Sequence, residues 1–223
     1  LEVGSVTAQL MHAGAIDAIV GMHTSQVRQR VLKDVARQIP YVYTPLYEGG
    51  ERTPGVFAIG ETPGRQLRPA IEYLASRYRA RRWMFVGNDY CWPRVSHRLA
   101  ARYVAEQGGE VVADRYLPFN TDDFSELLDE ISKLKPHAIL LSLVGQDAVQ
   151  FNRAFGRCGL SRDMFRLSCA IEENGLLHVA GIRAYPAQGA VAPRRHVEFG
   201  RVEPARLAEH VLRDVQVHRA RPS

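Results

Sequence analysis

Residues 137–144 read His-Ala-Ile-Leu-Leu-Ser-Leu-Val, an almost unbroken apolar run that follows Pro136. A strand of this composition is buried on both faces, which is typical of parallel sheets covered by helices on either side. Segments with helical spacing separate it from similar apolar runs at 16–20, 41–43, 56–59, 83–86, 110–117 and 164–169. This alternation of strand and helix predicts an α/β fold with parallel, doubly wound sheets.

Three of these strands end in segments rich in hydroxyl and aromatic side chains. The segments are Gly-Met-His-Thr-Ser at 21–25, Tyr-Thr-Pro-Leu-Tyr-Glu-Gly at 43–49 and Gly-Asn-Asp-Tyr-Cys-Trp-Pro at 87–93. Small ligands of open α/β proteins bind at the carboxyl ends of strands, and aromatic walls with polar tips are typical of pocket linings. The three segments therefore predict a binding site for a small neutral polar ligand.

The sequence lacks the patterns that indicate catalysis, a metal or a cofactor. It has no nucleophile elbow, phosphate loop, dinucleotide fingerprint or zinc-protease motif. The acidic pairs at 122–123 and 172–173 lie near expected helix starts, where they complement the helix dipole, and the eight His are scattered along the chain. We therefore expect a protein that is not an enzyme, with no catalytic residue, no metal and no cofactor.

The net charge of +5 is concentrated in the last segment of the chain. Residues 181–223 hold eight Arg against four acidic residues, so the rest is close to neutral. A neutral body without an aromatic-studded basic groove argues against direct nucleic-acid binding. No apolar run approaches the length of a membrane-spanning helix, so we expect no membrane span.

The Pro- and Gly-containing stretch at 61–64 is the expected crossing between two lobes. Ser25 and Thr121 are the expected N-caps of the helices that follow them, because a side-chain hydroxyl can satisfy the free amides of a first helical turn. Trp83 is expected in a core, and a helix is expected near 172–179. The predicted division is a partial first lobe at 1–62, a second lobe at 63–180 and an Arg-rich, weakly patterned tail at 181–223.

Four segments, taken in order, resemble the type I periplasmic-binding-protein family. They are Val-Gly-Met-His-Thr-Ser-Gln-Val-Arg at 20–28, Tyr43 with Tyr-Glu-Gly at 47–49, Phe-Val-Gly-Asn-Asp-Tyr at 85–90 through Pro93 and Arg94, and Pro-Phe-Asn-Thr-Asp-Asp at 118–123. The resemblance runs from about residue 16 to residue 180. It is strongest to the subgroup that binds amides, urea and branched-chain amino acids, which includes amide-sensing regulators of amidase operons.

The resemblance implies a two-lobed clamp that closes on a small ligand and performs no chemistry. By motif match it implies Ser25 and Tyr43 as ligand contacts of the first lobe, and Tyr90 and Trp92 as those of the second. Trp92 stands where the amide sensors look to have Tyr, so its indole narrows the pocket. Family members begin well upstream, which implies an incomplete first lobe here. Further candidate contacts are His23, Thr24, Tyr47, Val144 and Cys169.

From this resemblance we expect a sensor of an aliphatic amide-like ligand that regulates expression of an amidase or nitrile hydratase operon through a protein partner. The alternative is the substrate-binding component of an ABC transporter for amides, urea or branched-chain amino acids. An enzyme on the same architecture is disfavoured.

The number and spacing of the cysteines indicate the cellular compartment of the protein. Cys91, Cys158 and Cys169 are far apart in the sequence, which fits a reducing compartment. We therefore expect a cytoplasmic protein. A homo-oligomer is a separate expectation that does not depend on the cysteines. The alternative is a periplasmic protein or an extracytoplasmic lipoprotein, if the full-length N-terminus carries a signal.

Overall fold

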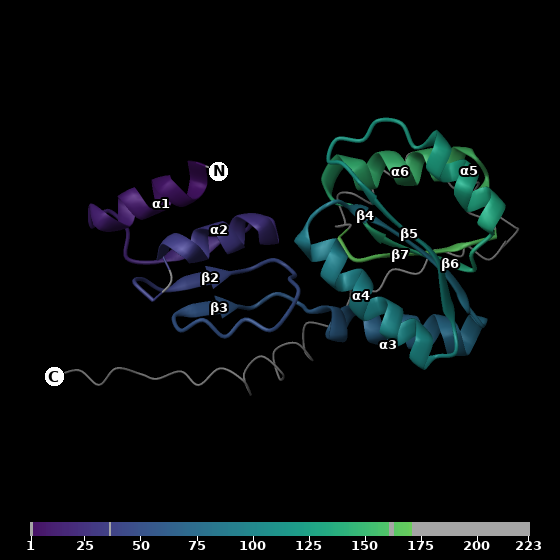
Figure 1. Cartoon of the computed structure of the whole chain (residues 1–223), viewed down its shortest axis with the longest axis horizontal. Coiled ribbons are helices and arrows are strands. Elements are labelled where there is room, and N and C mark those ends of the chain that lie inside the picture. The colour runs from purple at the N-terminus through teal and green to yellow at the C-terminus, as the bar shows by residue number, and fades with distance from the viewer. Residues whose placement is uncertain (1, 36, 161–162, 171–223) are drawn as a thin grey trace, which may run out of the picture.

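The chain forms two lobes that lie side by side, each with its own parallel sheet (Figure 1). The computed structural model describes residues 2–35, 37–160 and 163–170. The expected helix at 172–179 and the expected tail at 181–223 lie outside these residues. None of the helices in the described part of the chain combines the length and the apolarity that a membrane span requires.

The first lobe is a three-stranded sheet with two helices on one face (Figure 1). Its strands lie in chain order, and β2 pairs in parallel with both β1 and β3. Apolar residues of α2, such as Val31 and Val35, pack against Tyr41 and Tyr43 of β2. The elements are α1 (Glu2–His12), β1 (Ile19–Gly21), α2 (Ser25–Val35), β2 (Tyr41–Tyr43) and β3 (Val56–Ala58).

The second lobe is a four-stranded parallel sheet with helices on both faces (Figure 1). The strand order is β5-β4-β6-β7, so the chain leaves β4 toward one edge and later returns to its other side. The switch point of the sheet therefore lies between β4 and β6. The elements are α3 (Pro63–Tyr78), β4 (Arg82–Asn88), α4 (Cys91–Glu106), β5 (Glu110–Leu117), α5 (Ser125–Leu134), β6 (Ala138–Ser142), α6 (Gly145–Arg157) and β7 (Phe165–Ser168).

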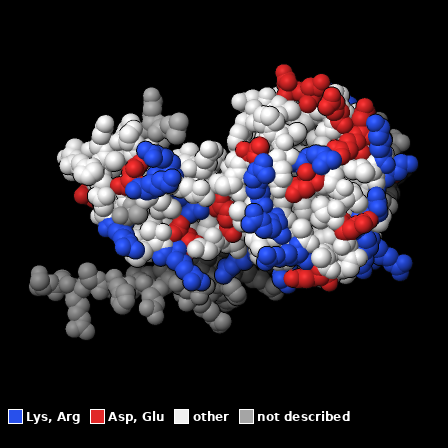
Figure 2. All heavy atoms as spheres, in the orientation of Figure 1, with Lys and Arg blue, Asp and Glu red and all other residues white. Residues whose placement is uncertain are grey.

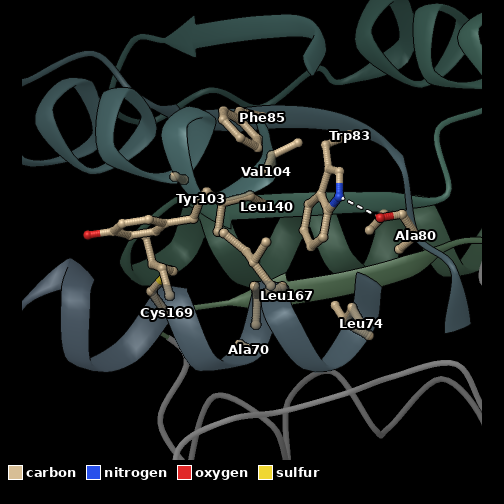
Figure 3. Packing of buried hydrophobic residues seen from close by; sticks show 14 of the residues in the cluster. Ala70, Leu74, Ala80, Trp83, Phe85, Tyr103, Val104, Leu140, Leu167 and Cys169 are labelled. Carbon is tan, nitrogen blue, oxygen red and sulfur yellow. Dashed lines mark hydrogen bonds between the residues drawn. The ribbon is translucent and has the colours of Figure 1, made fainter. Parts of the chain in front are cut away.

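Strand β4 shows why the apolar runs of this lobe do not alternate with polar residues. Trp83 and Phe85 join the core on the α3 and α4 side, whereas Met84 and Val86 join the core on the α5 and α6 side. Trp83 is fully buried, and its indole nitrogen donates a hydrogen bond to the carbonyl oxygen of Ala80 at 3.1 Å (Figure 3). The expectation that Trp83 lies in a core is confirmed. The α/β fold with parallel sheets, doubly wound in the second lobe, is confirmed as well.

Gly87, near the end of β4, allows α4 to begin close to the sheet. A Cβ atom at this position would lie 2.8 Å from Cβ of Pro93, which is closer than the contacts that real Cβ atoms make. A larger residue would therefore push the first turn of α4 away from the sheet. That turn contains Trp92, and Tyr90 directly precedes it.

Two helix starts differ from the expectation. Helix α5 begins at Ser125, and Thr121 does not cap it, because its hydroxyl donates to the carbonyl oxygen of Pro118 at 2.8 Å. The cap position is occupied by Phe124, and the carboxylate of Asp123 before it accepts the Ser125 amide at 2.8 Å. Ser25 is the first residue of α2 rather than its cap, because the carbonyl of Thr24 already accepts the Arg28 amide. The division of the chain at residue 62 stays a prediction, although α3 begins at Pro63.

Candidate ligand-binding site

A cavity of about 380 Å³ lies between the two lobes. Its walls come from the segments that follow β1 and β2 in the first lobe and β4, β6 and β7 in the second. The carboxyl ends of both sheets thus face one cavity, and in the second lobe it lies at the switch point between β4 and β6. The lining residues are Met22, His23, Thr24, Ser25, Tyr43, Pro45, Leu46, Tyr90, Trp92, Val144, Gly145, Cys169 and Ala170.

The structure therefore brings together almost all of the residues that the sequence suggested. Ser25, Tyr43, Tyr90 and Trp92 all line the cavity, as do four of the further candidates, His23, Thr24, Val144 and Cys169. Tyr47 is the exception, because the described lining residues do not include it. The sequence did not point to the aliphatic part of the lining formed by Met22, Pro45 and Leu46.

Ser25 supplies a buried hydroxyl that the described residues leave without a hydrogen bond. Its side chain is at the first turn of α2, and the residue is only 2% exposed. The hydroxyl lies close enough to Tyr43 to influence its ionisation, but Tyr43 donates its own proton to the carbonyl oxygen of His23 at 2.8 Å. Ser25 Oγ itself makes no hydrogen bond with a described residue. A buried hydroxyl in this state is expected to pair with a ligand or water.

The loop after β1 is held by hydrogen bonds that use the two tyrosines of β2. The Tyr41 hydroxyl donates to Nε2 of His23 at 2.9 Å, and Nδ1 of His23 donates to the carbonyl oxygen of Thr24 at 3.1 Å. With the Tyr43 hydrogen bond, these contacts fix residues 23–25 at the mouth of the cleft. Burial raises the pKa of Tyr43 above its usual value, so this phenol remains a donor further into alkaline pH than an exposed tyrosine does.

The wall from the second lobe is aromatic. The ring centroids of Tyr90 and Trp92 lie 6.2 Å apart, and the ring centroid of Phe119 lies 5.2 Å from that of Tyr90. Burial raises the pKa of the Tyr90 phenol, which keeps its proton. Arg94 pairs with Asp89 at 2.7 Å, so a charge-assisted contact joins the loop after β4 to the first turn of α4.

Asn88 positions this wall, although it was not among the site residues expected from the sequence. It is fully buried, its Nδ2 donates to Asp147 Oδ2 at 2.6 Å, and its Oδ1 accepts the Val144 amide at 2.9 Å. The same Asp147 oxygen accepts the Asn120 amide at 3.1 Å. Asn88 thereby joins the ends of β4 and β6 to the loop that carries Phe119. An Asn at the end of an apolar strand signals a buried polar group that needs partners.

The charges near the cavity are paired behind its wall. The guanidinium of Arg28 binds both Glu48, at 3.0 Å, and Glu51, and it lies over the rings of Tyr43 and Tyr47 at 5.3 and 5.4 Å. Tyr47 therefore packs against the Arg28 guanidinium and does not line the cavity. The described residues that line the cavity include no Asp, Glu, Lys or Arg. On the face shown in Figure 2, charged side chains of both signs are instead spread over the surfaces of both lobes.

Comparison with known proteins identifies the family. Residues 2–198 match the sequence family described as periplasmic binding protein, which is most of the chain. The chain belongs to the periplasmic binding protein family. The resemblance to the type I members is therefore confirmed, whereas membership of the amidase-regulator subgroup is not shown.

Several solved structures share the fold of this chain. An extracellular ligand-binding receptor from Rhodopseudomonas palustris HaA2 is 12% identical, with a TM-score of 0.71 over 80% of this chain and 50% of that one. A leucine-binding protein from Thermotoga maritima is 15% identical, with a TM-score of 0.67 over 81% of this chain and 53% of that one. An ABC-transporter solute-binding protein from Rhodopseudomonas palustris HaA2, in complex with p-hydroxybenzoic acid, is 18% identical, with a TM-score of 0.66 over 74% of this chain and 46% of that one.

The periplasmic binding protein described here spans about half the length of these neighbours. At such low identities the likeness shows the fold and not the ligand. The family and its neighbours are binding proteins rather than enzymes. The chain thus belongs to a family of binding proteins, and these comparisons do not identify its own ligand.

Proposed function

We propose that this chain is part of the substrate-binding component of an ABC transporter, which holds one small organic molecule between its lobes outside the cytoplasmic membrane. The observation that carries the proposal is the inter-lobe cavity with the unpaired hydroxyl of Ser25 on one side and the rings of Tyr90 and Trp92 on the other. Solute-binding proteins of ABC transporters are also among its structural neighbours. The extracytoplasmic location replaces the cytoplasmic one that the sparse cysteines suggested.

The proposed ligand carries a carboxylate or amide oxygen and a small apolar group. Helices α2, α4 and α6 begin at Ser25, Cys91 and Gly145, in or beside the cavity wall, and the amino end of a helix favours a partially or fully negative oxygen. Ser25 would donate to that oxygen. Tyr43, Tyr90 and Trp92 would enclose the apolar part, with His23, Thr24, Val144 and Cys169 as further contacts.

A cytoplasmic amide sensor that controls an amidase or nitrile hydratase operon is the second candidate. The observation that favours it is the uncharged lining of the cavity among the described residues, because a neutral amide needs no countercharge. Under this proposal the ligand would change the affinity for a regulatory protein partner. Homo-oligomer formation stays a prediction under either function.

The test is a thermal-shift titration of the full-length gene product with matched acid and amide pairs. Benzoate and benzamide are one matched pair, butyrate and butyramide are the other, and leucine and urea are added as separate probes. A ligand at ~100 times its Kd stabilises the folded state by about 2.7 kcal/mol. A shift with the acids or with leucine supports the transporter component, and a shift with the amides alone supports the sensor. No shift with any probe would contradict both proposals for these ligands.

A further inference from the structure

The loop after β2 connects the first lobe to the core of the second. Leu46 packs against the hydrophobic cluster that contains Tyr90 and Trp92, and Pro45 and Leu46 line the cavity beside these rings. Helix α2 of the first lobe also contacts helix α4 of the second. The chain from Pro45 to Glu48 is therefore part of the surface on which the two lobes meet.

Glu48, in the middle of this loop, has a buried carboxylate with a hydrogen-bond partner on only one of its two oxygens. Its side chain is 9% exposed, and Oε2 accepts a hydrogen bond from Arg28 at 3.0 Å. Oε1 is buried without a hydrogen bond to any described residue. Burying a carboxylate oxygen without a hydrogen-bond partner is unfavourable. A neighbour with positive partial charge would offset this cost.

That neighbour is the amino end of α4 in the second lobe. Cys91 is the first residue of this helix, and its thiol lies against the Glu48 carboxylate. Burial, followed by the charge of Glu48, raises the pKa of the Cys91 thiol to about 11. The free amides at the amino end of a helix carry partial positive charge, which attracts a carboxylate.

The net negative charge of the group formed by Arg28, Glu48 and Glu51 favours attraction between Glu48 and the amino end of α4. Arg28 is paired with two carboxylates, those of Glu48 and Glu51, so the cluster carries one negative charge more than Arg28 neutralises. Glu51 also accepts the backbone amides of Arg52 and Thr53, at 3.0 and 2.9 Å, and is thus satisfied within its own lobe. The second oxygen of Glu48 has no such partner among the described residues, and the Glu48 carboxylate lies beside Cys91 of the other lobe.

We propose that Glu48 is an inter-lobe positioning residue: its carboxylate attracts the amino end of α4 and so stabilises the lobe arrangement in which Tyr43 and Tyr90 enclose one ligand. Glu48 is not a ligand contact in this proposal. The effect on affinity rests on the proposed binding of a ligand in the cleft. The contact with Cys91 does not, and it is tested separately.

The affinity test compares Glu48→Gln with Glu51→Gln in the full-length protein. Both variants remove one carboxylate partner of Arg28, but only the first removes the charge that faces α4. Using the carboxylate or amide that shifts the wild type most, we expect Glu48→Gln to weaken binding about three- to tenfold and Glu51→Gln to leave the Kd within about twofold. Equal Kd values for the two variants would overturn the positioning role.

The contact test needs no ligand and measures alkylation of Cys91 at pH 8 by N-ethylmaleimide, followed by mass spectrometry. A Cys158→Ser background removes the exposed thiol, and Cys169 is buried. Since the thiolate is the reactive form, Glu48→Gln should speed alkylation of Cys91 several-fold, while Glu51→Gln should change it little. An unchanged rate in Glu48→Gln would overturn the contact itself. A faster rate in a protein that binds none of the probes would preserve the contact and reject the proposed function.

A second pair of variants covers the case in which Glu48→Gln does not fold. Cys91→Asp and Cys91→Asn have nearly the same shape and differ in charge. Asp is favourable at the first turn of an isolated helix, yet here it would repel Glu48. We expect Cys91→Asp to bind the probe several-fold more weakly than Cys91→Asn. Equal affinities of the two variants would overturn the proposal.

Discussion

The sheet of the second lobe is covered by helices on both faces, whereas the described residues cover only one face of the sheet in the first lobe (Figure 1). On the other face, Val20, Val42 and Phe57 are aligned across the three strands. Val20 is 75% exposed and Phe57 is 56% exposed. Parallel sheets are ordinarily buried on both faces, so the contacts among described residues account for the second lobe more fully than for the first.

The largest expected effect contrasts one Phe from each sheet. Phe85 in β4 is fully buried, and Phe85→Ala should lower the free energy of unfolding by about 3–5 kcal/mol through lost burial and the cavity left behind. Phe57→Ala in β3 should change it by less than about 0.5 kcal/mol. Urea denaturation measures both. A loss at Phe57 as large as the loss at Phe85 would show that the outer face of the first sheet is packed in the folded protein.

A smaller effect is expected from the buried polar contacts of the second lobe. Asn88→Ala leaves the Val144 amide and one contact of Asp147 unpaired, which should lower the free energy of unfolding by about 1–3 kcal/mol. It should also weaken ligand binding, because Val144 lines the cavity. Urea denaturation and titration with the best probe measure the two effects.

Asn152→Ala is the matched control for Asn88→Ala. Asn152 is also buried, and it bonds to Ala148 and Arg166 rather than to the cavity wall. Its loss should destabilise the protein to a similar degree while the affinity of the folded protein stays unchanged. If the two variants weaken binding equally, Asn88 has no particular part in shaping the site.

The smallest effect concerns alkaline pH and distinguishes buried tyrosines from exposed ones. Burial raises the pKa of Tyr90 above the usual value of about 10. The folded state therefore keeps this proton where the unfolded state loses it, so the stabilisation is complete below pH ~10 and declines as the pH rises further. Tyr90→Phe removes no hydrogen bond to a described residue. It should reduce the fall in unfolding free energy between pH ~10 and ~12 by less than about 1.4 kcal/mol per pH unit, as followed by urea denaturation. An unchanged slope would contradict the burial of this phenol.

Much of the fold could be predicted because it depends on local patterns. The apolar run at 137–144 contains β6 (Ala138–Ser142), and the segments after β1, β2 and β4 do line one cavity. Parallel strands place their carboxyl ends at one edge of a sheet, so residues far apart in sequence could be assigned to one site from strand ends alone.

What could not be predicted depends on contacts between distant residues. Asn88 and Asp147 are separated by 59 positions, and no local pattern pairs them. Thr121 has the right residue type for a cap, but its hydroxyl donates to the carbonyl of Pro118, and Asp123 accepts the first amide of the helix instead. Tyr47 has the right residue type for a pocket wall, but Arg28 occupies its ring face. In each case a partner that the sequence alone does not place decides the outcome.

The central claim is that one ligand is held jointly by Ser25 of the first lobe and Tyr90 of the second. It is tested most directly by calorimetric titration of the wild type, Ser25→Ala and Tyr90→Phe with the best acid or amide probe. The account predicts one ligand per chain and a loss of affinity of about 1–3 kcal/mol for Ser25→Ala, because a buried ligand oxygen loses its donor. A smaller loss is expected for Tyr90→Phe, which keeps the ring. Wild-type affinity in both variants, with the fold intact, would contradict the claim that the ligand lies in this cleft.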